Sequence, residues 1–229
     1  MKLAALFSGG KDSTYAIFLA KRLGHSIDVL LTLYPYSDES HLLHYPNITF
    51  TSLQAESMKI PHLIEKTSSD NYENETETLT NLVTLAKETY SIEGIVHGGI
   101  LSKYQKDNFS LVCEKNQLEI ISPLWNKEPE SYMKELLDEN FEYIISTVSS
   151  DGLNDSWLGQ TINETNLIEL KKLQKKFSFN LNFEGGEAET FVTNCPLFEK
   201  PLLIQDSTTK WDGYRGRFEI LEAKLKDNA

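Results

Sequence analysis

A glycine-rich turn directly after a short apolar run near the N-terminus sets the fold class of this chain. The run from Leu3 to Phe7 is short, apolar and followed by turn residues, which is typical of a buried parallel strand. The turn from Ser8 to Ser13 reads Ser-Gly-Gly-Lys-Asp-Ser, and residues 14–23 carry apolar side chains at helical spacing. This order predicts an α/β fold with an anion site at the helix N-terminus, where free amides and the helix dipole favour negative charge.

The turn is not the common phosphate loop. That loop needs a Gly five residues before its Gly-Lys pair and a Ser or Thr directly after the Lys, but this chain has Ala5 and Asp12 there. It resembles instead the pyrophosphate loop of enzymes that split ATP between its α and β phosphates. Asp12 indicates a contact with Mg²⁺, because its carboxylate would otherwise repel phosphate. The alternative is a tight turn in which Ser13 caps the helix. The residues predicted to hold ATP are Ser8, Gly9, Gly10, Lys11, Asp12 and Ser13.

Net charge narrows the range of partners. The 229 residues carry 22 basic and 34 acidic side chains, a formal net charge of −12, whereas binding to the backbone of DNA or RNA needs basic patches. Lysines cluster between residues 171 and 176, but a solvated helix face is the favoured interpretation of that stretch. We therefore expect no nucleic-acid partner.

The cysteines and histidines give no sign of a metal or redox site. Cys113 and Cys195 lie far apart and form no CxxC pair, so buried single thiols are expected. His41 and His44 fall in a polar loop without a partner at metal-ligand spacing. No signal peptide precedes the first strand, and no apolar run reaches the ~18 residues of a membrane span. We expect a cytoplasmic protein without a membrane partner.

The first half of the chain alternates predicted strands and helices. This rhythm predicts a mostly parallel sheet with helices on both faces, and such sheets bind ligands beyond the carboxyl ends of their strands. Ser8–Ser13, Tyr34–Ser37 and His97–Gly99 all lie at such ends. After the first strand and helix, the predicted strands are Ile27–Tyr34, Pro61–Lys66, Gly94–His97 and Leu118–Ile121, and the predicted helices are Glu75–Tyr90 and Ser102–Lys115.

The second half loses this rhythm and predicts a separate, smaller α+β unit. A boundary near Lys127–Pro129 gives a nucleotide-binding domain over residues 1–127 and a substrate-recognition domain over residues 128–229. The predicted helices are Glu130–Glu139 and Asn163–Lys176, and the predicted strands are Glu142–Val148, Thr190–Val192, Leu202–Gln205 and Phe218–Lys226.

Three separated motifs together are similar to one enzyme family. They are Ser8–Ser13, Gly98-Gly-Ile-Leu-Ser-Lys-Tyr-Gln-Lys106 with Pro123-Leu-Trp125 after it, and Glu184-Gly-Gly-Glu-Ala-Glu-Thr-Phe191 with Cys195-Pro-Leu-Phe198 after it. In this order they resemble the diphthine–ammonia ligases. The resemblance implies a Rossmann-like sheet of the adenine nucleotide alpha hydrolase type. Lys106 departs from the Arg of many relatives, which keeps the charge but loses the planar fork.

The resemblance implies ATP-dependent amidation of the diphthine carboxylate on translation elongation factor 2. A carboxylate is a poor electrophile, so ATP would activate it as an acyl-adenylate with release of pyrophosphate. Ammonia, drawn from free ammonium, would then displace AMP. The implied cofactors are ATP and Mg²⁺, and the implied partners are the diphthine-modified factor and ammonium. The sequence leaves the oligomeric state open, with a homodimer as one alternative.

The resemblance also assigns roles outside the loop. Leu33 and Tyr34 would contact adenine through backbone groups, while Gly98 and Gly99 would let the backbone pass close to ribose or the α-phosphate, with a plain turn as the alternative. The acidic motif would hold ammonium or the trimethylammonium group of diphthine, with a solvated turn as the alternative. The residues expected at the substrate are Tyr104, Gln105, Lys106, Glu184, Gly185, Gly186, Glu187 and Glu189, and the expected catalytic set is Lys11, Asp12, Glu187 and Glu189.

Two other functions stay open at this point. One is a same-fold amide ligase that acts on another carboxylate, and the other is a regulatory module that senses ATP or AMP without turnover. A tRNA thiolase is disfavoured, because neither cysteines near the predicted site nor a basic RNA-binding surface is evident. The presence of Lys11 and Asp12 in the loop, together with a second acidic motif, favours turnover.

Overall fold

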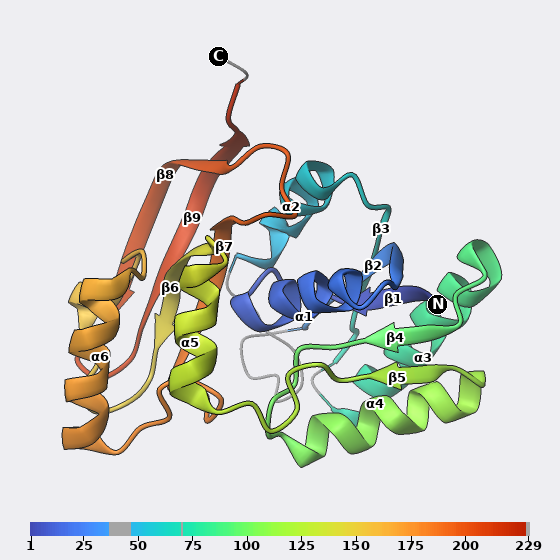
Figure 1. Cartoon of the computed structure of the whole chain (residues 1–229), viewed down its shortest axis with the longest axis horizontal. Coiled ribbons are helices and arrows are strands. Elements are labelled where there is room, and N and C mark those ends of the chain that lie inside the picture. Colours follow the sequence, from blue (N-terminus) through green and yellow to red (C-terminus); the bar gives the residue numbers. More distant parts are fainter. Residues whose placement is uncertain (37–46, 70, 228–229) are drawn as a thin grey trace. The chain divides into compact units, whose positions relative to one another are not determined.

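The computed structural model describes residues 1–36, 47–69 and 71–227 (Figure 1). The chain divides into two compact units, Met1–Trp125 and Asn126–Ala229, and each contains its own sheet. Ser37, at a predicted strand end, and His41 and His44, in a predicted polar loop, lie outside the described ranges. Within those ranges, no helix is both long enough and apolar enough to cross a membrane.

The first unit is built on a five-stranded parallel sheet with the order β3-β2-β1-β4-β5. This arrangement confirms the predicted Rossmann-like α/β fold, and the predicted strands and helices of this half are all present. The strands are β1 (Lys2–Leu6), β2 (Ser26–Tyr34), β3 (His62–Lys66), β4 (Gly94–Val96) and β5 (Glu119–Ile121), and the helices are α1 (Lys11–Arg22), α2 (Thr51–Met58), α3 (Tyr72–Tyr90) and α4 (Lys103–Asn116), with a 3-10 turn, η1 (Ile48–Phe50), before α2.

Both faces of this sheet are buried, as expected for parallel strands. Ala4 of β1 lies in a core with Val29 and Leu31 of β2 and with side chains of α3 and α4. Leu3 and Ala5 are equally buried, although alternation along the strand turns them to the opposite face. Helices therefore cover both faces of the sheet (Figure 1).

Helix α2 is absent from the sequence-based prediction because its buried face is largely polar. Thr51, Gln54 and Ser57 are buried together with Ala55 and Met58. A search for apolar spacing cannot find such a helix, since the residues that face inward carry no hydrophobic period.

Side-chain caps account for the start of three helices. Asn71 before α3, Glu128 before α5 (Pro129–Asp138) and Asn163 before α6 (Glu164–Phe177) each accept a hydrogen bond from a backbone N–H of the first turn. Helix α1 differs, because its N-cap residue Gly10 provides no side-chain hydrogen bond. The first turn of α1 is therefore left without the usual capping oxygen.

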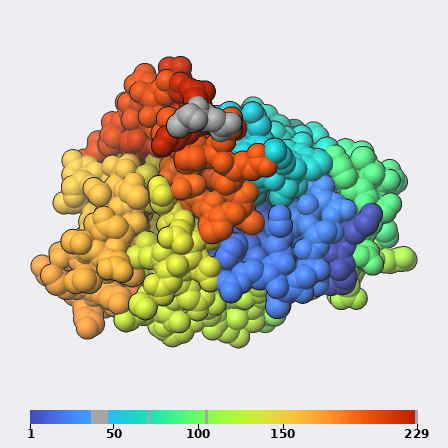
Figure 2. All heavy atoms as spheres, turned by 45° about the horizontal axis from the view of Figure 1, so that its top comes forward, coloured from blue at the N-terminus to red at the C-terminus, as the bar shows by residue number. Residues whose placement is uncertain are grey.

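The second unit is an antiparallel sheet with the order β7-β6-β9-β8 and two helices, α5 and α6. This confirms the predicted α+β unit, although β8 runs six residues past the predicted end at Gln205. The extra residues are mostly polar and exposed, so they carry no hydrophobic alternation. Helix α6 and the β8–β9 hairpin form much of the surface shown for this unit (Figure 2, orange to red). Its strands are β6 (Glu142–Val148), β7 (Ala188–Asn194), β8 (Leu202–Trp211) and β9 (Gly216–Leu225), with a 3-10 turn, η2 (Asp155–Trp157), after β6.

Both cysteines are buried free thiols, as the sequence predicts. Burial raises the pKa of Cys113 and of Cys195 to about 12, so each thiol stays protonated and unreactive near neutral pH. Among the described residues, no group of three or more His, Cys, Asp or Glu side chains could hold a metal ion.

Candidate active site

Two segments predicted to bind the nucleotide meet where the strand order of the first sheet reverses. Strands β2 and β3 lie on one side of β1, and β4 and β5 lie on the other. Such a switch point is where open α/β sheets bind their ligands. Ser8–Ser13 follows β1, and His97–Gly99 follows the neighbouring parallel strand β4. The fold therefore brings these two segments together.

The loop after β1 leaves the first turn of α1 accessible to an anion. Gly9 has a φ of 78°, a conformation that favours glycine, whereas Gly10 is extended and is the N-cap residue. Ser13 lies inside the helix, where its hydroxyl donates to the carbonyl of Gly10 at 3.2 Å and contacts the Ser8 hydroxyl at 3.2 Å. Ser13 is therefore not the cap, and no N-cap side chain occupies the amides that a helix N-terminus offers to phosphate.

Lys11 and Asp12 place a buried cation beside a partly exposed carboxylate. The Lys11 side chain is 2% exposed, and its ammonium lies 3.0 Å from each carboxylate oxygen of Asp12. This ion pair offsets the cost of burying the ammonium, and it places a positive charge at the N-terminus of α1, where an anion is favoured. Asp12 is 33% exposed, and one carboxylate of this kind holds Mg²⁺ together with substrate phosphates at many nucleotide sites. The residues therefore fit a Mg²⁺–nucleotide complex.

Three side chains outside the loop hold its backbone in place. The buried amide of Gln54 in α2 donates to the carbonyl of Gly9 at 3.0 Å. Thr32 of β2 donates to the carbonyl of Phe7 at 2.7 Å, and Nε2 of His62 in β3 lies 2.7 Å from the Thr32 hydroxyl. Neither a motif nor apolar spacing marks Gln54 or His62 in the sequence, because their role depends on which strand and helix lie next to the loop.

Leu33 and Tyr34, the two residues predicted to contact adenine, end β2 beside the loop. The carbonyl of Tyr34 already accepts a hydrogen bond from the amide of Thr67 at 2.9 Å. On the other side of β2, the carbonyl of Leu31 accepts a hydrogen bond from the backbone N–H of Phe7, which follows β1. Peptide groups point to alternate sides along a strand, so those of Leu33 also face the β1 side. The paired part of β1 ends at Leu6, opposite Leu31, so Leu33 lies beyond it. Leu33 is therefore better placed than Tyr34 for a backbone contact at the switch point.

Gly98 packs against the loop itself. A Cβ at this position would lie between 2.5 and 2.7 Å from backbone atoms of Asp12 and Ser13, which leaves room only for glycine. The neighbouring Gly99 donates its backbone N–H to Nδ1 of His97 at 3.0 Å. The glycines after β4 therefore do more than turn the chain, because Gly98 packs directly against the backbone of the loop.

Three residues predicted at the substrate begin helix α4. The ammonium of Lys106 lies 4.1 Å from the ring centroid of Trp125, a cation–π contact within the first unit. Its charge also helps to lower the pKa of His97, so Lys106 is close to the segment after β4. The side chains of Tyr104 and Gln105 lie outside what the structure describes, and their roles stay predictions.

The acidic motif of the second unit forms a turn that one of its own glutamates holds together. Glu187 accepts hydrogen bonds from the backbone N–H groups of Asn180 and Gly185, both at 2.8 Å and one on each carboxylate oxygen. Gly186 has a φ of 78°, and its carbonyl accepts a hydrogen bond from the Ser149 hydroxyl. Glu187 therefore has a structural role that its position in the motif alone does not reveal.

Glu184 and Glu189 lie on either side of this turn, and both are half-buried. The backbone N–H of Glu189, in β7, donates to the Thr147 hydroxyl at 2.9 Å. A Cβ on Gly185 would lie 2.6 Å from a carboxylate oxygen of Glu187, so a larger residue there would displace that carboxylate. The motif is therefore an ordered turn with an exposed tip at Gly185 and Gly186.

Burial keeps two histidines of the first unit neutral. It lowers the pKa of His62 to about 4 and, together with the charge of Lys106, the pKa of His97 to about 4. In an unfolded chain both would titrate near pH 6.5, so between these two values the unfolded state binds more protons than the folded state.

We therefore expect the free energy of unfolding to fall as the pH drops from about 6.5 towards 4. The contribution is at most roughly 3 kcal/mol for His97 and smaller for the more exposed His62. Urea unfolding at a series of pH values measures this slope. Replacing His62 with Gln is expected to flatten it, and a variant with the wild-type slope would contradict a neutral His62 in the folded protein.

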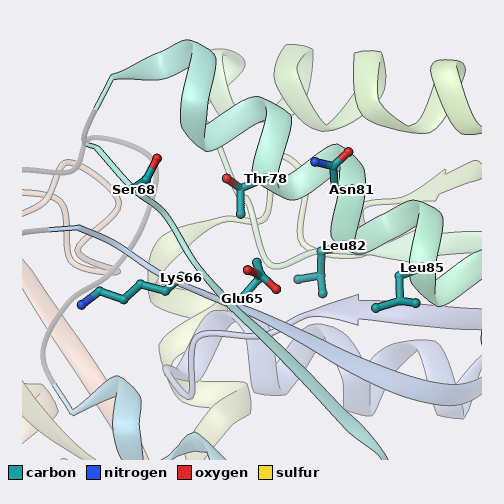
Figure 3. Close-up of a pocket in the computed structure, with 7 residues that line it drawn as sticks. All are labelled: Glu65, Lys66, Ser68, Thr78, Asn81, Leu82 and Leu85. Atoms are coloured by element: carbon teal, nitrogen blue, oxygen red, sulfur yellow. The ribbon is translucent and has the colours of Figure 1, made fainter.

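A separate pocket of about 310 Å³ lies between the end of β3 and one face of α3 (Figure 3). No residue of the glycine-rich loop lines this pocket, and none of its lining residues belongs to the predicted site. This pocket is therefore separate from the predicted nucleotide site. The lining residues are Glu65, Lys66 and Ser68 on the strand side and Thr78, Asn81, Leu82 and Leu85 on the helix side.

A parallel sheet with a lysine-bearing glycine loop at its switch point defines a nucleotide-binding α/β protein. Family models describe the matching regions as the diphthamide synthase N-terminal domain, over residues 1–120, and the diphthamide synthase C-terminal domain, over residues 128–225. The chain belongs to the diphthine–ammonia ligase family, as its three motifs predict.

Individual relatives agree with this family. A Homo sapiens protein named diphthine–ammonia ligase is 36% identical over 227 residues, which cover 90% of this chain and 84% of that protein. A Rattus norvegicus protein of the same name is 35% identical over 225 residues, with the same coverage of both chains. These names confirm the expectation of a ligase. A solved structure from Methanocaldococcus jannaschii is described as a predicted subunit of tRNA methyltransferase. Its match covers 85% of this chain and 98% of that chain, with 15% sequence identity and a TM-score of 0.39.

Proposed function

We propose that this protein catalyses the ATP-dependent amidation of the diphthine carboxylate on translation elongation factor 2. The carboxylate oxygen attacks the α-phosphate of ATP, pyrophosphate leaves, and an acyl-adenylate forms. Ammonia then attacks the acyl carbon and displaces AMP, which gives diphthamide. The observation that carries this proposal is the buried Lys11 beside Asp12 at the uncapped N-terminus of α1, in a chain of this family.

In this proposal the loop binds and neutralises charge, and it forms no covalent bond. The amides around Gly9 and Gly10 and the ammonium of Lys11 hold the β and γ phosphates, which leave together as pyrophosphate. Asp12 would hold Mg²⁺, which would supply positive charge to offset the negative charge of the phosphates. The peptide groups of Leu33 at the end of β2 would contact adenine. The rate gain then comes mostly from alignment and charge stabilisation.

The acidic motif serves the substrate in this proposal. The quaternary ammonium group of diphthine is a cation, and ammonium must lose a proton before it can attack a carbonyl carbon. Carboxylates suit both tasks. We assign these tasks to the motif as a whole, with Glu184 and Glu189 on either side of the turn and Glu187 holding the turn through two backbone amides.

The partners follow from the same reaction. We propose that ammonium comes from solution and that the protein acts in the cytoplasm on the modified factor. The net charge of −12 favours a protein partner over a nucleic acid. Homodimer formation would be decided by light scattering of the purified protein.

The deciding experiment measures AMP and pyrophosphate with three forms of elongation factor 2: diphthine-modified, unmodified and absent. We expect both products only with the modified factor, and diphthamide by mass spectrometry only when ammonium is also present. Products formed equally with the unmodified factor would indicate another carboxylate substrate. ATP binding without products under any of these conditions would indicate a sensing module instead.

A further inference from the structure

His97 connects the segment after β4 to the end of β5 through both of its ring nitrogens. The backbone N–H of Gly99 donates to Nδ1 at 3.0 Å, and Nε2 lies 2.6 Å from the hydroxyl oxygen of Ser122. Nδ1 can accept this hydrogen bond only while it is unprotonated, so the neutral ring carries its proton on Nε2 and donates it to Ser122. The two contacts thus define one tautomer and one orientation of the ring.

The surroundings of the ring hold it in that orientation and charge state. His97 is 1% exposed, and its ring meets Phe109 of α4 edge-on with the centroids 5.1 Å apart. Lys106 is close enough to act on the ring electrostatically, and burial with this positive charge keeps the pKa of His97 near 4. The imidazole is therefore neutral at physiological pH, and both of its hydrogen bonds persist there without a change of protonation.

The segment that His97 holds is the one that packs against the nucleotide loop. Gly98 approaches the backbone of Asp12 and Ser13 so closely that a Cβ would lie 2.5 Å from the nearest atom. Close-packed contacts of this kind transmit small displacements. A shift of the Gly98–Gly99 turn would therefore move the first turn of α1, where the phosphates are proposed to bind.

We propose that His97 is a positioning residue of the nucleotide site: Nδ1 fixes the Gly98–Gly99 turn, and this turn fixes the first turn of α1. This role depends on the proposed function in one respect, namely that ATP is the ligand that the loop binds. His97 contacts no reacting atom and works through the hydrogen bond to Gly99. Ser122 then serves to hold the tautomer and has a smaller influence on the loop.

Two replacements separate the ring nitrogens. The side-chain oxygen of His97→Asn can take the place of Nδ1 and accept from Gly99, whereas the side-chain nitrogen of His97→Gln can take the place of Nε2 and donate to Ser122. Calorimetric titration with α,β-methylene ATP and Mg²⁺ measures the nucleotide affinity. We expect the Asn variant to bind within about threefold of wild type and the Gln variant about tenfold more weakly, the size of one lost buried hydrogen bond.

Kinetics and NMR distinguish positioning from a general loss of structure. In the Gln variant we expect KM for ATP to rise while KM for ammonium stays unchanged, and the amide resonances of Asp12 and Ser13 to shift. The Asn variant should leave those resonances near their wild-type positions. Ser122→Ala is the matched control, because it removes the partner of Nε2 alone, and its nucleotide affinity should stay within about threefold of wild type.

Three results would overturn the proposal: equal loss of affinity in the Asn and Gln variants, unmoved Asp12 and Ser13 amides in the Gln variant, or a protonated Nδ1 in the ¹⁵N spectrum of the wild type. The last measurement needs no variant, so it decides even if a variant fails to fold. A wild-type protein that binds no ATP analogue would instead refute the proposed function. The amide shifts of Asp12 and Ser13 would then still decide whether His97 positions the loop.

Discussion

Replacing Lys11 with Met is expected to lower the rate of substrate-dependent pyrophosphate release by roughly 100-fold to 1,000-fold, the usual effect of removing one charge-stabilising donor. Met has a similar length and no charge, so it can fill the buried position, where the Lys11 side chain is 2% exposed. The loss is electrostatic, because the ammonium next to Asp12 is the positive charge of the loop. The release of pyrophosphate, coupled to a phosphate-detecting enzyme assay, measures the effect.

Lys21→Met is the matched control, since Lys21 lies exposed in the last turn of the same helix. We expect this variant to keep the wild-type rate and to lose only a few tenths of a kcal/mol of stability through the helix dipole. Thermal unfolding of both variants would show whether each is folded at the assay temperature. A folded Lys11→Met protein with a normal rate would remove the loop from the proposed mechanism.

The part of the site that is local in sequence could be predicted from the sequence. A short apolar strand, two glycines and a lysine before a helix define the anion loop, because strand, turn and helix N-terminus are consecutive. The placement of Gly98 at the same edge of the sheet also follows, since parallel strands have their carboxyl ends at one edge, whereas its contact with the loop depends on the pairing of β1 with β4. The loop and the shared edge need only the order of elements along the chain and the rules of α/β topology.

The supports of the site could not be predicted, because they come from elements that are distant in sequence. Gln54 reaches Gly9 from a helix whose buried face is polar, so no hydrophobic period marks it. His62 acts through Thr32 on a neighbouring strand, and the tautomer of His97 depends on Ser122. Such pairs appear only once the strand order and register are known.

Glu187 shows a different limit of sequence reasoning. The spacing of the acidic motif does not distinguish its three glutamates, and all three are predicted to contact the substrate. Only the geometry shows that Glu187 binds the backbone of Asn180 and Gly185. Charge and spacing can indicate that a carboxylate is needed in a turn, but the hydrogen-bond donors around it decide whether it faces a ligand or the backbone.

Gly98→Ala is expected to weaken nucleotide binding at least tenfold and to lower the free energy of unfolding by about 1–3 kcal/mol, the usual cost of overpacking. The added methyl group would meet the backbone of Asp12 and Ser13 at 2.5 to 2.7 Å, where no flexible side chain can yield. Either β4 or the first turn of α1 must therefore move. Calorimetric titration with an ATP analogue and urea unfolding measure the two effects.

The matched control is Gly213→Ala in the β8–β9 turn. Gly213 has a φ of 104° and nothing within 4 Å of an added Cβ, so alanine there is strained without touching a neighbour. We expect a stability loss of about 1–3 kcal/mol from that strain and an unchanged nucleotide affinity. Because we expect both variants to lose a similar amount of stability, a difference in their nucleotide affinity would come from the contact of residue 98 with the loop. If both variants bound the nucleotide with the same affinity, Gly98 would contribute to folding alone. The loop would then tolerate displacement of the segment after β4 against which it packs.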